Sequence, residues 1–261
     1  MTPSLHSKLA ATSLDLPPSI QTLIASIRSQ SNITPDLARQ LIVDANITEH
    51  ELAPWANFQH PVAHSYGRKL IYAEPHFEIL VMSWAEGDYS AIHDHGVAQW
   101  GAVQCFGLAE HNVYQLNNRT LRLVEQGLSY PNSVNAVDSD LIHQMGNPSR
   151  VEFLSLHVYG CAAGHPSVTS DAGVFDLFEG CIHHTDGGVF FCLPESDISY
   201  RIEGLRGDRD TTLMHHQWML ARVQRMLGSD EECDRRWLRE REVQLLDRIE
   251  RLRSTSPAAT F

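Results

Sequence analysis

The sequence predicts a mainly β protein, folded as a sandwich or a barrel, with helical segments before and after it. Residues 54–195 contain many short stretches rich in β-branched and aromatic residues, separated by frequent turn signals. The flanking parts of the chain repeat their apolar residues at helical spacing. At 261 residues, 43% of them hydrophobic, the chain can fill a sizeable core. We therefore divide it into N-terminal helices (1–53), a β domain (54–195) and a helical C-terminal extension (196–261).

The N-terminal segment predicts two helices. One opens at residues 15–19, and the other at Thr34, which caps it ahead of Pro35. Their apolar residues recur at helical spacing: Ile20, Leu23, Ile24, Ile27, Leu37, Leu41 and Ile42. We expect both helices to pack on the β domain without taking part in chemistry, and residues 1–16 to lack regular structure.

The β domain is predicted from strand-forming composition and from the turn residues between the strands. The predicted strands cover residues 65–72, 77–84, 91–95, 100–108, 111–115, 120–125 and 151–159. The predicted turns lie at Gly127 and at residues 131–132, 138–140 and 147–149. Two further stretches, 175–181 and 188–193, are joined by residues 183–187 and should form a closing hairpin.

The C-terminal extension predicts two amphipathic helices. Ser229 to Glu232 reads as a capping box between them. Their apolar stripes consist of Leu213, Met219, Leu220, Val223, Met226 and Leu227, and of Trp237, Leu238, Leu245, Ile249 and Leu252. We expect these helices to pack on the outside of the β domain; the alternative is a dimerisation or partner helix. Whether the protein is a monomer or a dimer stays open.

Charge and composition exclude several kinds of partner. A net charge of −12 disfavours nucleic acid and anionic membranes. No stretch approaches ~20 consecutive apolar residues, and the first ten residues lack the apolar run of a signal peptide. The five cysteines form no C-x-x-C and are odd in number, which indicates reduced thiols. We expect a cytoplasmic protein.

Three histidines form the candidate metal site. His93 and His95 are two positions apart in a predicted strand, so their side chains should face the same way. Two neutral imidazoles on one face can chelate Fe, Zn, Ni or Cu. His143, in a second apolar stretch, can supply a third nitrogen. The alternative is a surface or structural role for the pair.

The spacing around these histidines resembles the two signature motifs of the cupin superfamily. Gly87 precedes His93-x-His95, Gly107 follows, and His143 is followed by Asn147. Position 100, often a metal-binding Glu in cupins, is Trp here. The absence of Glu narrows the resemblance to the cysteine dioxygenase-like thiol dioxygenases, over residues 54–195. The resemblance implies a cupin-type jelly-roll barrel and a ferrous site of His93, His95 and His143, with open positions for a thiolate, an amine and dioxygen.

A second polar cluster lies on the strand at 151–159. Alternation places Ser155, His157 and Tyr159 on one face, and three polar groups on one buried face must each find a hydrogen bond. The alternative is an outward polar face. In thiol dioxygenases such a run forms a relay. The resemblance implies that Tyr159 donates its hydroxyl near the substrate, oriented by His157, which Ser155 orients in turn.

Arg68 is the candidate carboxylate ligand. Its planar guanidinium can bind a carboxylate through two parallel hydrogen bonds. The Gly67–Ile71 stretch resembles the cysteine dioxygenase strand whose Arg binds the substrate carboxylate, whereas relatives that prefer 3-mercaptopropionate commonly have Gln. The resemblance thus implies cysteine as substrate, with Tyr66 beside it. The alternative for Arg68 is a surface salt bridge.

Positions 100 and 101 also decide whether a cross-link to Tyr159 can form. Animal-type cysteine dioxygenases cross-link a Cys to the active-site Tyr, and the corresponding residue is Trp100 by direct count or Gly101 after a one-residue shift. Neither is Cys, so we expect no thioether at Tyr159. We assign Trp100 to the substrate pocket, where its inward-facing ring would shrink the space for substrate and weaken the assignment of cysteine.

Other candidate residues are assigned structural roles. We expect Asp94 to point away from the metal and either to hydrogen-bond to the metal ligands or to stabilise a turn. The adjacent pairs His183-His184 and His215-His216 are expected at the surface, because neighbours in sequence do not face one ligand.

We therefore predict a non-haem Fe(II) thiol dioxygenase that converts L-cysteine and O2 to cysteine sulfinate. Both oxygen atoms enter the sulfur, so no external reductant is needed. Two alternatives stay open. One is the oxidation of another small thiol, such as 3-mercaptopropionate. The other is a non-catalytic metal-binding cupin that senses a small acid.

Overall fold

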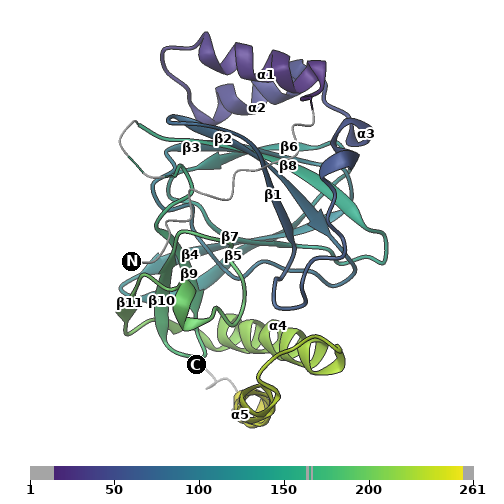
Figure 1. Cartoon of the computed structure of the whole chain (residues 1–261). Helices are drawn as coiled ribbons and strands as arrows, with labels where there is room; N and C mark the ends of the chain where they lie inside the picture. The colour runs from purple at the N-terminus through teal and green to yellow at the C-terminus, as the bar shows by residue number, and fades with distance from the viewer. Residues whose placement is uncertain (1–14, 163–164, 166, 255–261) are drawn as a thin grey trace, which may run out of the picture.

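The computed structural model describes residues 15–162, 165 and 167–254, and it is mainly β, as predicted. Two sheets face each other and curl into a barrel, with helices above one sheet and below the other (Figure 1). The helices are α1 (Pro18–Arg28), α2 (Pro35–Ala45), α3 (Glu49–Leu52), α4 (Arg209–Gly228) and α5 (Arg235–Ser254), with 3-10 turns η2 (Ala53–Trp55) and η3 (Glu195–Asp197).

The strands form three sheets. The first, in the order β1-β2-β8-β3-β6, contains Gly67–Glu74, Phe77–Trp84, Phe153–Gly160, Trp100–Cys105 and Val134–Asp138. The second, β12-β5-β4-β7, contains Arg206–Gly207, Thr120–Ser129, Ala109–Asn117 and Ile142–Gly146. The third, β11-β10-β9, contains Tyr200–Glu203, Cys181–Thr185 and Ala172–Asp176.

An extended segment around His93 joins the second sheet to the third. The backbones of His93 and His143 exchange two hydrogen bonds of 2.9 Å, and on the other side Asp94 N–H donates to Gly173 and Phe175 N–H donates to Ile92. The segment predicted as strand 91–95 is therefore extended, with isolated bridges in place of a regular ladder. It sits between β7 and β9, and this position brings the sequence-distant histidines together.

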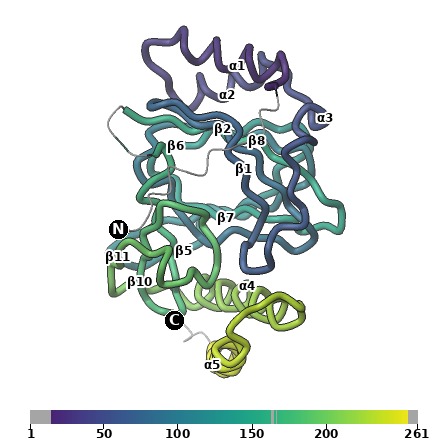
Figure 2. Tube along the Cα trace, in the orientation of Figure 1, coloured from purple at the N-terminus to yellow at the C-terminus, as the bar shows by residue number. Residues whose placement is uncertain are grey.

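The three central strands of the first sheet, β2, β8 and β3, are buried on both faces. Every residue of β2 and of β8 is buried. One face lines the barrel interior, and the other packs under α1 and α2, as the tube in Figure 2 also shows. Burial on both faces explains why β2 is largely apolar and matches its predicted range of 77–84. The buried strand β8 instead alternates apolar residues with Ser155, His157 and Tyr159.

The helices lie largely where the sequence predicts them. Thr34 caps α2 by accepting a hydrogen bond from Leu37 N–H at 3.2 Å. The apolar stripe of α4 packs into the barrel core, and α5 packs on it through Leu238 and Leu245. The packing interpretation is thus confirmed for these buried faces. Residues 1–14 lie outside the described part of the chain.

The predicted capping box at 229–232 is wrong. α5 begins at Arg235, and Asp234 caps it: its carboxylate accepts a hydrogen bond from Trp237 N–H at 3.0 Å. Residues 231 and 232 precede α5. Neither can therefore occupy the third helical position, from which the Glu of a capping box accepts a hydrogen bond from the backbone N–H of the N-cap residue.

Among the described residues, none of the helices combines the length and the apolar character that a membrane span requires. All five cysteines are free.

The predicted closing hairpin is also wrong. The hairpin joins β9 and β10 around residues 177–180, where the Asp176 carboxylate accepts from Phe178 and Glu179 N–H and Gly180 adopts a φ of 72°. Residues 183–187 therefore belong mostly to a strand. Gly127 is likewise not a turn, because it lies inside β5. Strands β11 and β12 lie beyond residue 195, so the sheets extend past the proposed domain boundary, and the three-part division stays a prediction.

The adjacent histidine pairs are not at the surface. His215 and His216 are buried where α4 meets the barrel, against Phe191 and Phe178 respectively. His183 is buried on one face of β10, whereas His184 stacks on Tyr200 with the ring centroids 4.2 Å apart. Adjacent residues do point apart, as the sequence argument assumed, but here both directions lead to packed surroundings.

Candidate metal centre and substrate pocket

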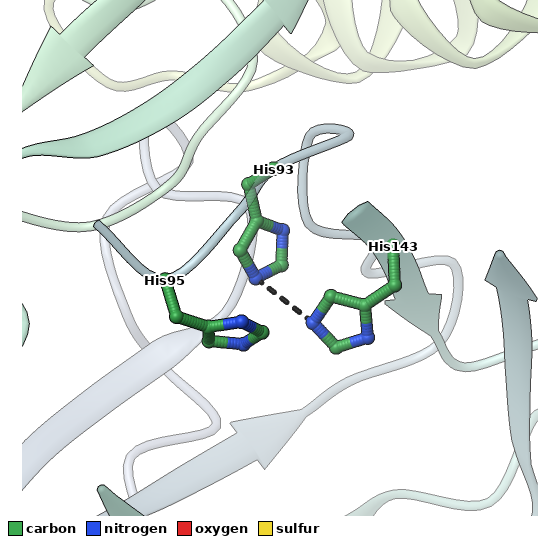
Figure 3. A group of neighbouring side chains, drawn as sticks. All are labelled: His93, His95 and His143. Atoms are coloured by element: carbon green, nitrogen blue, oxygen red, sulfur yellow. Dashed lines mark hydrogen bonds between the residues drawn. The ribbon is translucent and has the colours of Figure 1, made fainter. Parts of the chain in front are cut away.

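His93, His95 and His143 converge on one space inside the barrel (Figure 3). Each offers a nitrogen within 4.8 Å of the others, and the Nε2 atoms of His93 and His143 are 3.1 Å apart. All three side chains are buried. The same cavity is lined by Arg68, Tyr66, His157 and Tyr159. The structure thus gathers almost every candidate residue at one site.

The protonation of the three rings suits a metal cation. His93 Nδ1–H donates to the carbonyl of Ala91 at 2.9 Å, so its Nε2 lone pair faces the shared space. Neither nitrogen of His95 has a hydrogen-bond partner among the described residues. Burial lowers the pKa of His93 to about 4 and also depresses the pKa values of His95 and His143, which keeps the imidazoles neutral.

His111 is a site residue that the sequence reasoning missed. Its Nε2 lies 2.8 Å from Nδ1 of His143. If His143 donates its Nδ1 proton there, its Nε2 lone pair points into the shared space, where a cation would sit. Three lone pairs crowded together without a proton between them repel, and the unpartnered nitrogens of buried His95 are costly. These side chains therefore fit a metal with imidazole preference.

Ser155, His157 and Tyr159 form a continuous hydrogen-bonded row along β8. Ser155 Oγ lies 2.8 Å from His157 Nε2, and His157 Nδ1 lies 2.9 Å from the Tyr159 hydroxyl. The row has a further member that the sequence reasoning missed: Trp84 Nε1–H donates to Ser155 Oγ at 2.8 Å. The tilted ring of Tyr159 lies 5.0 Å from that of His95, centroid to centroid, so the row ends beside the histidine cluster.

The indole of Trp84 fixes the direction of this row. An indole only donates, and Ser155 has no other acceptor among the described residues, so its hydroxyl donates to His157 Nε2. Burial lowers the pKa of His157 to about 3, so the neutral ring carries one proton, which Nδ1 donates to the Tyr159 oxygen. Burial raises the pKa of Tyr159, which keeps its own proton. That proton is then free to point into the cavity.

Arg68 lines the cavity without a carboxylate partner within the described residues. Its guanidinium donates to Thr169 Oγ1 at 3.2 Å. Thr169 in turn donates to Glu78, which also accepts from Ser167 Oγ at 2.8 Å and from Val168 N–H at 3.1 Å. A neutral hydroxyl thus positions the guanidinium, and most of its donors have no partner among the described residues. No sequence signal pointed to Thr169.

Tyr66 closes another side of the cavity. Its ring stacks on Trp84 at a centroid distance of 4.8 Å, and its hydroxyl accepts from Val189 N–H at 3.3 Å. Burial raises the pKa of Tyr66, so the hydroxyl remains a donor.

Asp94 has a turn role: its carboxylate accepts from Gly96 N–H at 3.0 Å and Gly173 N–H at 2.8 Å.

Trp100 does not line the cavity, so its assignment to the substrate pocket is corrected. It packs with the residues under α1 and α2, and its ring lies over Gly160 on the outer face of the first sheet. The register pairs Gly101 with Tyr159 across β3 and β8. Gly101, not Trp100, therefore lies opposite the tyrosine.

Gly101→Ala should lower the free energy of unfolding by about 1–3 kcal/mol, because a Cβ there would lie 2.5 Å from Tyr159 Cδ1. Chemical denaturation of both proteins measures this loss. Gly127→Ala is the matched control, since its nearest neighbour would be 3.9 Å away. Equal stability of Gly101→Ala and wild type would mean that the two strands pair differently.

The mass of the intact protein should also show no cross-link at Tyr159.

The barrel and its histidine cluster define a cupin that could bind a metal. The family model described as cysteine dioxygenase type I matches residues 7–164, more than half of the chain, and the protein belongs to this family. Many solved structures, some of them described as cupins, are similar to this chain at low sequence identity. The conserved protein SPY1581 of unknown function from Streptococcus pyogenes is 15% identical, over 37% of this chain and 75% of that one, with a TM-score of 0.30.

Two further structures are similar to a comparable extent. The cupin domain of Cnp3 from Schizosaccharomyces pombe is 10% identical, with 41% of this chain and 68% of that one covered and a TM-score of 0.32. The protein TT1209 from Thermus thermophilus is 14% identical, with 42% and 93% covered and a TM-score of 0.33.

Proposed function

We propose that the protein is a non-haem Fe(II) dioxygenase that oxidises L-cysteine to cysteine sulfinate. Membership of the cysteine dioxygenase family supports a thiol dioxygenase in general. The observation that carries the specific proposal is the composition of one cavity. Three neutral imidazoles, a tyrosine hydroxyl at the end of an oriented row, and a guanidinium without a carboxylate partner among the described residues all line it.

The three histidines would hold the metal. Imidazole suits iron as well as zinc, copper and nickel, and a set of three neutral nitrogens leaves the cation its full charge and open positions. Ferrous iron bound there would supply a redox-active centre at which a thiolate and dioxygen can meet. His111 would hold His143 in the required tautomer from behind.

The reaction balances without a further reductant. The thiol sulfur gains both atoms of O2 and loses four electrons, which the dioxygen takes up, while the carbon–sulfur bond stays intact. The S–H proton leaves to solvent, because a sulfinic acid is ionised at neutral pH. The protein therefore needs to bind only a thiol and O2.

The remaining side chains would bind and orient the thiol. Arg68 would take the carboxylate of cysteine through its free donors, with Tyr66 as a further donor nearby. Tyr159 would donate its proton in a hydrogen bond to the oxygen that develops negative charge. His157 and Ser155 would be positioning residues, since they act through Tyr159.

An oxygen electrode tests the proposal. Iron-loaded protein should consume O2 with cysteine and release sulfinate in equal amounts, and should be much less active with cysteamine. A thiol panel that shows 3-mercaptopropionate to be the best substrate would contradict the choice of cysteine. Thiol binding without any O2 uptake would instead identify a sensor and overturn the enzymatic proposal.

Tyr159→Phe should keep iron and cysteine binding but lower kcat by roughly ten- to a hundredfold, because only one hydrogen-bond donor is removed. Steady-state kinetics and metal analysis on the same preparation measure both effects. Tyr130→Phe, at an exposed tyrosine, is the control. A Tyr159→Phe enzyme with unchanged kcat would exclude the hydroxyl from catalysis.

A further inference from the structure

A second set of metal-ligating side chains converges outside the candidate centre. Glu179, Cys181 and His183 alternate along the end of the β9–β10 turn and the start of β10, so all three project to one side of the chain. Their donor atoms lie within 4.8 Å of one another. Cys181 and His183 are buried, and the Glu179 side chain is about one-third exposed.

Both neighbours approach the same atom of His183. Cys181 Sγ lies 2.9 Å from His183 Nε2, and a Glu179 carboxylate oxygen lies 3.2 Å from that same nitrogen. In a Cys-His-carboxylate triad, the thiol and the carboxylate would use different ring nitrogens. This geometry therefore does not suit a nucleophilic cysteine activated by a histidine.

One neutral nitrogen cannot serve both neighbours. If Nε2 carries the proton, it donates to Glu179, and the thiol of Cys181 loses its acceptor. If Nε2 carries the lone pair, it can accept from the thiol, but it then faces a carboxylate oxygen that offers no proton. A divalent cation removes this conflict, because it accepts electron pairs from a thiolate, an imidazole and a carboxylate at once.

The distances between the ligand atoms are close to those that a small cation needs. With Zn–S near 2.3 Å and Zn–N and Zn–O near 2.0–2.2 Å, neighbouring ligands of a tetrahedral ion lie roughly 3.4–3.6 Å apart. The two distances seen here are within several tenths of an ångström of that range. One thiolate, one imidazole and one carboxylate match zinc and similar borderline metals, with a fourth position left for water.

The surroundings orient the ligands and favour a cation. The other oxygen of Glu179 accepts from Arg241 at 2.9 Å, and the guanidinium of Arg241 lies over the ring of Phe178 at 4.2 Å. This contact with α5 holds the carboxylate in place while leaving one oxygen for a metal. Across the strands, Asp176 and Glu203 pair in register with Cys181, so two further carboxylates face the same region.

We propose that Glu179, Cys181 and His183 form a second metal site for zinc or a similar thiophilic divalent cation, separate from the three-histidine centre. Bound metal would tie the β9–β10 turn to the start of β10 and, through Arg241, to α5. A cysteine sulfur is a soft ligand, so the site should favour a thiophilic cation. Mg²⁺ and Ca²⁺ should not bind there.

Cobalt(II) titration of metal-free protein tests this site, because a cysteine thiolate gives cobalt a charge-transfer absorption that three imidazoles cannot give. The His95→Ala background removes the first centre. That protein should bind one Co²⁺ per chain with a dissociation constant below about 1 µM and show the thiolate band, and Zn²⁺ should abolish the band by displacement. Absence of binding at that concentration would overturn the proposal.

Cys181→Ser on the same background should lose the thiolate band and weaken Co²⁺ binding at least about tenfold. Cys233→Ser, at a partly exposed cysteine outside the cluster, is the matched control and should keep the band. A band that persists in Cys181→Ser would overturn the site. Should that variant fail to fold, Glu179→Gln, at a partly exposed turn position, should weaken Co²⁺ binding by about tenfold while retaining the band; unchanged affinity would contradict the proposed ligand set.

Discussion

His95→Ala should reduce the iron content of the three-histidine centre from about one ion per chain to nearly none, and abolish oxygen uptake. Loss of an outer partner typically costs roughly 10–100-fold in metal affinity, and loss of one of only three ligands should cost more. The fold should survive, because His95 makes no hydrogen bond to other described residues and its removal relieves two unpartnered buried nitrogens.

Metal analysis after loading with Fe(II), together with circular dichroism, measures both parts of this prediction. His76→Ala is the matched control, because it removes an exposed imidazole and should leave the iron content unchanged. If His95→Ala still bound about one iron per chain, the metal would have to lie elsewhere. The three-histidine assignment would then fail, whatever the activity of the variant.

Arg68→Ala should lower kcat/KM for cysteine by roughly ten- to a hundredfold, with little effect on iron content. A hydrogen bond to a charged group contributes about 1.5–3 kcal/mol, and each 1.4 kcal/mol corresponds to a factor of about ten. Among the described residues, the guanidinium of Arg68 donates to the hydroxyl of Thr169 and has no anionic partner. A substrate carboxylate would supply that partner. Cysteamine, which lacks the carboxylate, should be a poor substrate of the wild type and should not become worse.

Arg68→Gln sharpens the test of substrate choice, because it should shift preference towards 3-mercaptopropionate relative to cysteine. Kinetics with cysteine, cysteamine and 3-mercaptopropionate on the wild type and both variants provide the comparison. Lys69→Ala controls for loss of a cation from the same strand, since Lys69 is exposed. If cysteamine served as well as cysteine in the wild type, the carboxylate role of Arg68 would be wrong, while the metal centre would stand.

The parts of the fold with strong local patterns could be predicted from the sequence. Strand β2 was predictable because most of its eight residues are apolar, β-branched or aromatic, and α2 because Thr34 and Pro35 mark its start. The grouping of His93 with His95 follows from strand alternation alone. His143 joins this pair only because two segments 50 residues apart in the sequence lie side by side. The resemblance to a known family indicated this third ligand, and sequence spacing alone could not.

The errors arise where tertiary contacts or register decide the outcome. The predicted pocket position of Trp100 is wrong because a one-residue shift along a strand exchanges its two faces, and nothing local to residues 100–105 fixes that shift. Thr169 and Trp84 complete the site through contacts that span 101 and 71 residues. His183 was assigned to the surface because its neighbour obscured the alternating E-x-C-x-H pattern.

The most direct test of the central claim is the fate of labelled dioxygen. Iron-loaded protein, cysteine and isotopically labelled O2 should yield cysteine sulfinate that carries two labelled oxygen atoms, as mass spectrometry of the product can show. This result would establish a thiol dioxygenase. A product with one labelled atom, a disulfide in place of the sulfinate, or oxygen derived from water would contradict the account, because each requires a different reaction at the same cavity.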